Sequence, residues 1–138
     1  MEKESFHLSL PCKSISETKD FYVNTIGAEL GRNSSLWLDV DLFGNQITFN
    51  KSGAFDFVYK SYKFEETVLP SFHFGIIIGN EKWNGLYDKL QTANSEPLKK
   101  ITFLINRTGE HESFFIKDPN GYTVEFKRFK SQKEMFAK

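Results

Sequence analysis

Two matching stretches, Phe6-His7-Leu8 and Phe72-His73-Phe74, decide the fold of this chain. Each places a histidine inside an apolar run, and apolar residues at alternating positions are typical of a β-strand. The second histidine follows the first by 66 residues (73 minus 7). This spacing predicts that the 138-residue chain contains two copies of one structural module.

Later residues match in the same order. Asp41-Leu42-Phe43-Gly44 corresponds to Asp118-Pro119-Asn120-Gly121, and Thr48-Phe49 corresponds to Glu125-Phe126. The proline and glycine of the later tetrapeptide favour a turn, because proline fixes φ and glycine accepts a positive φ. Each module is therefore expected to end in a strand, a turn and a strand.

The first module, about residues 5–51, is predicted to have the order βαβββ. Ser14 or Ser16 can cap its helix, and Gly27 stands where a left-handed residue would end it. The expected helix covers residues 17–26, and the expected strands cover 6–10, 28–32, 36–42 and 46–50.

The second module, about residues 72–130, is predicted to repeat that order. Its helix, at 81–93, can be capped by Asn80, and its strands are expected at 72–78, 101–106, 113–117 and 123–129. Residues 52–71 are expected to form an aromatic linker, and residues 131–138 a polar tail that could extend as a short helix. The pattern predicts an α+β fold in one domain spanning residues 1–138.

The composition excludes several classes of protein. The chain is 39% apolar and 16% aromatic, which is too much for a disordered segment. No run approaches the roughly 20 apolar residues that cross a bilayer, and residues 1–6 do not resemble a signal peptide. Eighteen basic residues balance eighteen acidic ones, whereas nucleic-acid binders usually carry a basic surplus. A single cysteine, Cys12, suits a reducing compartment, so we expect a cytoplasmic protein without membrane or nucleic-acid partners.

The repeated histidines are candidate metal ligands. A lone strand histidine is more often a partly buried residue with satisfied hydrogen bonds. Here, however, His7 and His73 share one register position and converge if the modules pack with pseudo-twofold symmetry.

Glu125 is the third candidate ligand. It lies between Val124 and Phe126, and Thr123 and Lys127 are its neighbours on its own strand face. A carboxylate facing a cavity there costs several kcal/mol unless it is paired or bound to a metal; the alternative is a solvent-facing strand residue. Two histidines and one carboxylate form a facial triad that leaves positions open for substrate and O₂.

An ordered set of motifs across residues 5–130 resembles the vicinal oxygen chelate superfamily, also called the glyoxalase, bleomycin-resistance and dioxygenase superfamily. The motifs are Phe6-His7-Leu8, Phe21-Tyr22, Ile26-Gly27, Gly31-Arg32, Phe43-Gly44-Asn45-Gln46, Phe72-His73-Phe74-Gly75, Asp118-Pro119-Asn120-Gly121 and Glu125-Phe126-Lys127. Residues 31–35, 37–39 and 83–86 most resemble a subgroup described as predicted extradiol-type dioxygenases.

The resemblance implies two tandem βαβββ modules that form a cupped mixed sheet around one metal. It implies that His7, His73 and Glu125 are the ligands of one divalent transition metal, with Fe(II) expected first and Mn, Zn or Ni as alternatives. Related glyoxalase I enzymes would place a fourth carboxylate or a glutamine at position 48. Thr48 is a poor ligand, so three protein ligands with open positions are expected.

Other side chains are candidates for the chemistry around the metal. His111 is a candidate acid or base, or a surface-loop histidine. Tyr122 could donate to a substrate oxygen, or be a half-buried tyrosine after a turn. Gln46 lies on the strand face of Thr48 and could bind substrate or a metal-bound water. Arg32 and Arg107 could bind an anionic substrate group, or pair with surface carboxylates.

Two further features have structural interpretations. Asp39 and Asp41 alternate with apolar residues and could simply form the solvated face of a strand. Cys12 is expected to be a small buried residue, since nothing in the sequence pairs with it as a nucleophile would need.

The expected function is that of a metal-dependent, dioxygenase-like oxidoreductase acting on a small, catechol-like, oxygen-chelating substrate. The alternatives are a non-catalytic binding protein of the bleomycin-resistance type and a glyoxalase-like lyase or isomerase. Small members of the superfamily commonly form twofold dimers, so we also expect a homodimer, with the aromatic linker either at its interface or folded over the mouth of the cup.

Overall fold

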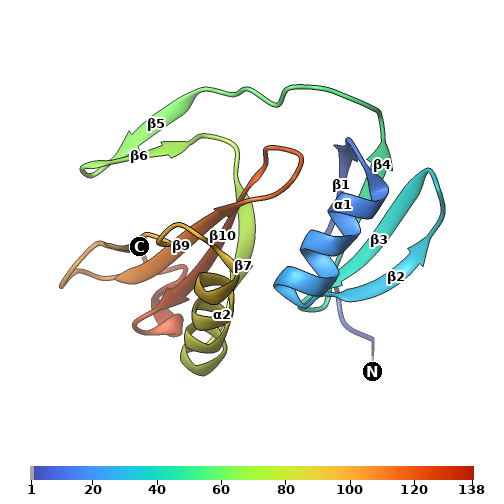
Figure 1. The fold of residues 1–138 in the computed structure, drawn as a ribbon. Coiled ribbons are helices and arrows are strands. Elements are labelled where there is room, and N and C mark those ends of the chain that lie inside the picture. Colours follow the sequence, from blue (N-terminus) through green and yellow to red (C-terminus); the bar gives the residue numbers. More distant parts are fainter. Residues whose placement is uncertain (1) are drawn as a thin grey trace. The chain divides into compact units, whose positions relative to one another are not determined.

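A computed structural model describes residues 2–138, which divide into two compact units. Unit 1 contains the residues up to Phe57 together with Asp118–Gly121, and unit 2 contains Val58–Lys117 and Tyr122–Lys138. Each unit holds a four-stranded mixed sheet and a helix (Figure 1). The expected α+β class and the repeated βαβββ order are confirmed, because both sheets are made from the same succession of elements.

Unit 1 begins with the first module. Its sheet has the order β1-β4-β3-β2, in which β1 and β4 are parallel and the other neighbours are antiparallel. Its elements are β1 (His7–Cys12), α1 (Ile15–Lys19), a π-helix (Asp20–Ile26), β2 (Glu29–Asn33), β3 (Trp37–Leu42) and β4 (Asn45–Lys51).

Local sequence signals explain the ends of these elements. The Ser14 hydroxyl accepts a hydrogen bond from the backbone N–H of Glu17, which makes Ser14 the cap of α1. Gly27 ends the helical segment with φ 94°, and Gly44 has φ 89° in the turn between β3 and β4. The helical segment widens into a π-helix after Lys19, which the sequence pattern did not predict.

The two faces of the first sheet differ in polarity. One face is buried and apolar, and the ring of Tyr22 packs at 4.8 Å from that of Phe49 beneath the helical segment. The expectation that Cys12 is buried is confirmed, since its side chain is fully covered. The other face alternates with the first along each strand and carries His7, Gln46 and Thr48.

The turn Asp118–Gly121 packs within unit 1 although it joins two strands of unit 2. The hydroxyl of Tyr22 donates to Asp118 Oδ2 at 2.8 Å, and the backbone N–H of Lys13 donates to Asn120 Oδ1 at 2.8 Å. Gly121 has φ 92°, so the predicted turn is confirmed.

Unit 2 contains the second module and a hairpin before it. Its main sheet has the order β7-β10-β9-β8, with β7 and β10 parallel. Its elements are β5 (Ser61–Phe64), β6 (Thr67–Pro70), β7 (Phe74–Ile77), α2 (Asn80–Ala93), β8 (Lys100–Phe103), β9 (His111–Lys117), β10 (Thr123–Phe129) and a 3₁₀-helix (Gln132–Glu134).

Three details of unit 2 differ from the sequence prediction. Asn80 is the first residue of α2, and the extended residue Gly79 precedes it as the cap. β8 ends at Phe103 because Leu104 takes a positive φ of 54°, which a strand cannot continue. The predicted linker 52–71 contains the antiparallel hairpin β5–β6.

Aromatic side chains build the core of unit 2 between α2 and its sheet. Trp83 on α2 is fully buried, and its indole N–H donates to the Phe126 carbonyl at 2.9 Å. Its ring packs edge-on against Phe114 at 5.2 Å. This packing fixes β9 and β10 under the helix and leaves their other face open for a site.

Strand register confirms the internal repeat. In unit 1, Ser9 on β1 lies opposite Thr48 on β4, and in unit 2, Gly75 on β7 lies opposite Glu125 on β10. Both strand pairs are parallel, and each joins the first strand of its module to the last. Thr48 and Glu125 therefore occupy equivalent positions, as the sequence alignment predicts.

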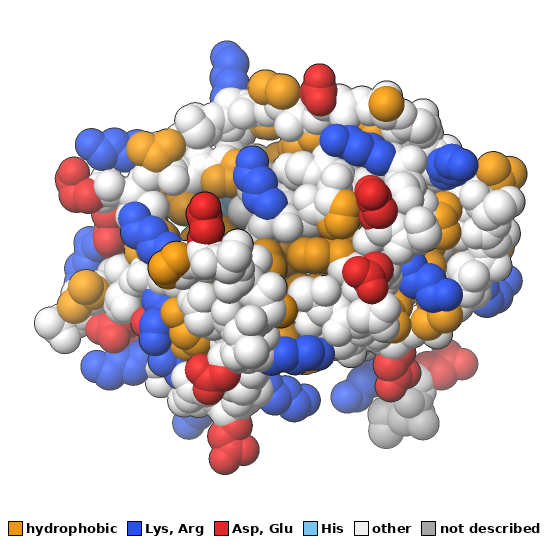
Figure 2. Space-filling view, in the orientation of Figure 1, with side chains coloured by type: hydrophobic (Ala, Val, Ile, Leu, Met, Phe, Trp, Pro, Cys, Tyr) orange, Lys and Arg blue, Asp and Glu red, His pale blue; other side chains and the backbone are white. Residues whose placement is uncertain are grey.

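The surface of each unit mixes charges of both signs. Figure 2 shows acidic and basic side chains interspersed with apolar ones on the drawn face, as the zero formal net charge would suggest. Among residues 2–138, no helix combines the length and apolar character that a membrane span requires.

Candidate metal centre

His73, which immediately precedes β7, and Glu125 on β10 form a pair. The Nε2 atom of His73 lies 3.2 Å from Glu125 Oε1, and the side chains are only 20% and 10% exposed. The other ring nitrogen of His73, Nδ1, lies 2.9 Å from the Pro70 carbonyl oxygen, to which its N–H donates. The pair is thus held at both ends, by β6 and by β10.

Two neighbours complete this cluster. The hydroxyl of Ser113, which is fully buried on β9, donates to Glu125 Oε2 at 2.5 Å. The ammonium of Lys127 lies 3.9 Å from the same oxygen. Glu125 therefore meets a hydrogen-bond donor on each carboxylate oxygen and a cation nearby, which explains how it stays buried within a strand.

The pair shifts the pKa of both members. The hydrogen bond to Glu125 raises the pKa of His73 against the opposing effect of burial. Burial acts to raise the pKa of Glu125, but hydrogen bonds from His73 and Ser113 and the charge of Lys127 outweigh it, so the net shift is downward. Both shifts favour an imidazolium beside a carboxylate.

A cleft opens beside the pair. Its volume is about 230 Å³, and its lining residues are His73, Phe74, Gly75, Ile76, Ile77, Glu125 and Lys127. Gly75 has no side chain to fill the space, and a Cβ there would meet the Glu125 carbonyl oxygen at 1.6 Å. The absence of a side chain at Gly75 thus allows β7 to approach the backbone of Glu125 on β10 closely.

His7 lies at the corresponding position of unit 1. It is an exposed residue on β1 and lies opposite Gln46 on β4. On the same face, Asp39 accepts hydrogen bonds from Thr48 Oγ1 at 2.6 Å and from Gln46 Nε2 at 3.3 Å. The open face of the first sheet thus carries a histidine, an amide and a carboxylate.

The burial of Asp39 corrects one expectation. Its side chain is nearly buried and hydrogen-bonded, so it does not belong to a solvated strand face. Asp41 is exposed and caps the β3–β4 turn by accepting the Gly44 N–H at 2.7 Å.

The three predicted metal ligands are drawn from both units. The structure brings His73 and Glu125 together in unit 2, and it places His7 on unit 1. No group of three His, Cys, Asp or Glu side chains arranged to hold a metal ion occurs among residues 2–138. The complete ligand set therefore stays a prediction.

Comparison with solved structures identifies the fold. A glyoxalase/bleomycin resistance protein/dioxygenase from Alicyclobacillus acidocaldarius matches with a TM-score of 0.78 and 29% identity over 96% of both chains. The chain has the vicinal oxygen chelate fold. The superfamily resemblance inferred from the sequence is thereby confirmed.

More distant structures share the vicinal oxygen chelate fold. The fosfomycin resistance protein FosX from Listeria monocytogenes matches with a TM-score of 0.63 and 16% identity, over 99% of this chain and 100% of that one. A virulence protein from Salmonella typhimurium matches with a TM-score of 0.58 and 19% identity over 94% and 98%. No family model and no curated protein matches the chain.

His111 lies at the start of β9 and not in a surface loop. Its ring packs at 5.2 Å from Phe103 and 5.1 Å from Phe129, and its Nδ1 lies 2.8 Å from the Gly109 carbonyl oxygen. With Nδ1 donating, Nε2 is the ring nitrogen at which the neutral form of His111 can accept a proton.

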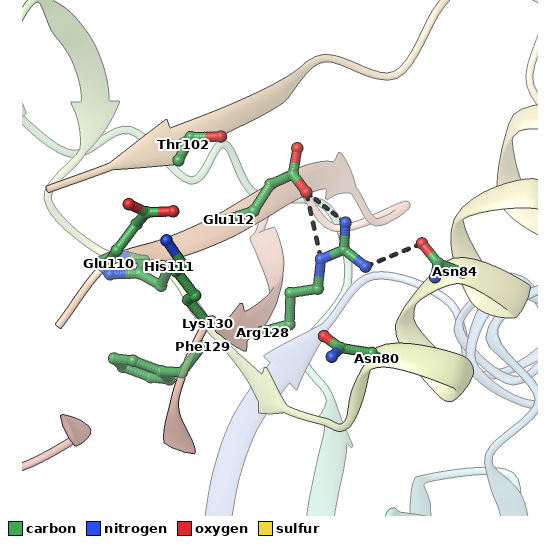
Figure 3. Close-up of a pocket in the computed structure, with 9 residues that line it drawn as sticks. All are labelled: Asn80, Asn84, Thr102, Glu110, His111, Glu112, Arg128, Phe129 and Lys130. Carbon is green, nitrogen blue, oxygen red and sulfur yellow. Dashed lines mark hydrogen bonds and ion pairs between the residues drawn. The ribbon is translucent and has the colours of Figure 1, made fainter. Parts of the chain in front are cut away.

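His111 also lines a pocket of about 460 Å³ in unit 2, which Figure 3 shows in close-up. Inside it, the Arg128 guanidinium donates twice to Glu112 Oε1, at 2.6 and 3.2 Å, and once to Asn84 at 3.0 Å. The arginine charge is therefore already matched by a carboxylate of the same pocket.

The remaining candidates lie in different surroundings. Tyr122 is fully buried and packs near Phe72, instead of being half-buried. Arg107 donates to Glu65 at 2.8 Å, which is the carboxylate pairing given as its alternative. Arg32 is exposed, lies 5.8 Å from the Trp37 ring, and lines a pocket of unit 1 with Asp39.

Sequence reasoning did not assign a role to Ser113 or Asp39. Ser113 stands at the interior of an apolar strand, Ser113-Phe114-Phe115-Ile116, where a buried hydroxyl needs a partner. That signal was present in the sequence, but only the β9–β10 register shows that the partner is Glu125.

Proposed function

We propose that this protein is a metal-dependent enzyme of the vicinal oxygen chelate type. In this proposal His7, His73 and Glu125 bind one divalent transition metal, Fe(II) in the first place, with Mn, Zn and Ni to be compared. The proposed activity is that of a dioxygenase-like oxidoreductase acting on a small substrate whose neighbouring oxygens chelate the metal, as those of a catechol do. The protein is proposed to act in the cytoplasm.

The His73–Glu125 pair is the observation that carries the proposal. Metal-ligating histidines usually donate their second N–H to a carbonyl or carboxylate, and His73 donates Nδ1–H to Pro70. This leaves Nε2 as the ligand atom, 3.2 Å from a carboxylate oxygen. The donor set of two imidazoles and one carboxylate fits non-haem Fe(II).

The register of the two sheets supports the third ligand. Ser9 and Gly75 are equivalent, so His7 and His73, each two residues earlier, are equivalent too. Thr48 takes the position of Glu125 in unit 1, but its hydroxyl already donates to Asp39. The chain thus offers three good ligands, which favours an open site over the four-ligand site of a glyoxalase-like lyase or isomerase.

The protein's own side chains would orient the metal-binding carboxylate and exchange a proton with the substrate. A bound Fe(II) would supply adjacent positions at which an oxygen-chelating substrate and O₂ meet. Ser113 and Lys127 keep Glu125 ionised and oriented. His111 is the proposed acid–base residue, because its Nε2 lone pair remains able to accept a proton.

Anaerobic reconstitution tests the proposal. The purified protein is loaded with Fe(II), Mn, Zn or Ni, the bound metal is quantified, and O₂ uptake is measured with a panel of catechols. We expect one metal per chain and metal-dependent O₂ uptake. His111→Ala is the matched control for the ligand histidines, since it should lower turnover but keep the metal.

A binding protein without catalysis is the second candidate. It is favoured by the exposed aromatic side chains Tyr59 and Tyr62, which could cover an apolar ligand. A protein that takes up no transition metal, yet binds an aromatic antibiotic, would support this candidate and contradict the enzyme.

A further inference from the structure

The open face of the second sheet is positively charged around its single carboxylate. Strand alternation and the β9–β10 register place Glu125, Lys127, Ser113 and Lys117 on this face. In the described part of the chain, Glu125 is the one acid among the residues that this register puts there. Two lysines therefore face one carboxylate.

Lys127 is placed to meet a ligand. It lines the cleft together with His73 and Glu125, and its side chain is 28% exposed. Its ammonium lies 3.9 Å from Glu125 Oε2, which is beyond direct hydrogen-bond distance, and 5.9 Å from the Phe129 ring. Its three N–H donors are consequently not consumed by Glu125.

A bound metal ion would add positive charge to the cleft, and Lys127 would then affect which ligands bind there. A dication beside one carboxylate and one ammonium leaves two positive charges uncompensated in and around a partly buried cleft. Charges at such short distances interact strongly where water is scarce. A ligand that brings a negative group relieves this repulsion, whereas a neutral ligand of the same shape does not.

We infer that Lys127 makes the cleft selective for organic anions: the substrate carries a carboxylate, or another anionic oxygen group, that contacts Lys127 while its neighbouring oxygens bind the metal. This inference rests on the proposed function and narrows its substrate class. Lys127 is then a specificity-determining residue.

Two matched ligands and three variants test the inference. The probes are 2,3-dihydroxybenzoate and its neutral isostere 2,3-dihydroxybenzamide, with the 3,4-isomers as a second pair, because the two members of each pair have nearly the same shape and differ in charge. Binding to Co(II)-loaded protein is followed by the visible absorption of the metal and by calorimetry. The variants are Lys127→Met, Lys127→Arg and, as the control for charge alone, Lys89→Met on the exposed face of α2.

Lys127→Met should weaken binding of the organic anion without weakening binding of the metal. Lys127→Met should weaken binding of the benzoate by about tenfold and leave the benzamide unchanged, since one charge-assisted contact is lost. The same variant should bind Co(II) at least as tightly as wild type, because a cation beside the metal is removed. Lys127→Arg should retain the preference, and Lys89→Met should match wild type.

Other outcomes separate the two proposals. If Lys127→Met lost the same affinity for the benzoate and the benzamide, or bound Co(II) more weakly, Lys127 would have a structural role. That result would overturn the inference alone. Wild-type protein that binds Co(II) but does not prefer the benzoate of either pair would also overturn it. Wild-type protein that takes up no metal would overturn the proposed function, and the inference with it.

Discussion

The Nε2 atom of His73 lies 3.2 Å from Oε1 of Glu125, although 51 residues separate the two in the chain (125 minus 73, minus 1). Their approach follows from topology, because β7 and β10 are parallel neighbours in the sheet and Gly75 lies opposite Glu125. One histidine and the carboxylate of the proposed facial triad thus lie side by side within one unit.

Replacement of His73 by alanine should abolish metal binding. The variant loses one of three proposed ligands, and we expect metal affinity to fall at least about 100-fold, since even residues around a ligand cost 10–100-fold. Unfolding free energy should drop by only about 1–3 kcal/mol, because Ser113 and Lys127 still satisfy Glu125. Calorimetric metal titration, with circular dichroism for the fold, measures both.

His111→Ala is the control for this experiment. It removes the one other histidine of the chain outside the ligand set and should bind metal as wild type does. If His73→Ala kept full affinity, His73 would not be a ligand.

The His73–Glu125 pair should make the stability of the metal-free protein depend on pH. The raised pKa of His73 stabilises the fold below the ordinary imidazole value of about 6.5, and this contribution is lost as pH rises through the folded pKa. The lowered pKa of Glu125 stabilises the fold above about 4.3, and this contribution is lost as pH falls through its folded pKa. The pair therefore contributes most between about pH 4.3 and 6.5.

Glu125→Gln isolates this contribution. Urea unfolding of both proteins in the presence of a chelator gives the stability difference at each pH. We expect this difference to be larger at pH 5.5 than at pH 8.5. A difference that stayed constant across this range would show that the pair does not exist in solution.

Most of the fold could be predicted from the sequence because the chain repeats itself. The strands that follow the two repeated histidines, the helix end at Gly27 and the turn at Gly121 are predicted by local signals, and all are observed. His7 is the first residue of β1, whereas His73 lies just before β7 and not inside the strand. The neighbouring residues in the sequence align Thr48 with Glu125, and the strand register places these two residues at equivalent positions.

The parts that escaped prediction depend on contacts between distant residues. Alternation along the strand predicts that Asp39 lies on a solvated face. In the structure its side chain is buried and accepts hydrogen bonds from Gln46 and Thr48 on β4. The hairpin β5–β6 lies within residues 52–71, whose aromatic composition predicts only a linker. Glu65 ties it to the rest of unit 2 by accepting from the Leu104 N–H and from Arg107.

Gly75→Ala should disrupt the site through the backbone. A Cβ at this position would meet the Glu125 carbonyl oxygen at 1.6 Å, so β7 and β10 must separate. We expect a loss of about 3 kcal/mol or more in unfolding free energy and weaker metal binding. Thermal unfolding monitored by circular dichroism measures the loss of stability, and metal titration measures the loss of metal affinity.

Gly85→Ala provides the matched control. Gly85 lies within α2, and a Cβ there has no atom within 4 Å. Because glycine is a poor helix former, this substitution should stabilise the protein by about 0.5–1 kcal/mol. Gly75→Ala protein as stable as wild type would contradict the close approach of the two strands.

Self-association is the last property that the sequence and structure allow us to predict. The segment before and along the hairpin β5–β6 exposes large apolar side chains: Val58 at 85%, Tyr59 at 67% and Val68 at 67%. A small monomer rarely shows such a group to water, and zero net charge gives little repulsion between copies. We therefore expect a homodimer of the 16.0 kDa chain at micromolar concentration, measured by light scattering. Val68→Glu should shift the mass toward the monomer, whereas Phe136→Glu, at an even more exposed apolar residue near the C-terminus, should leave it unchanged. A monomer mass for the wild-type protein would refute the dimer without touching the metal site, because all three proposed ligands lie in one chain.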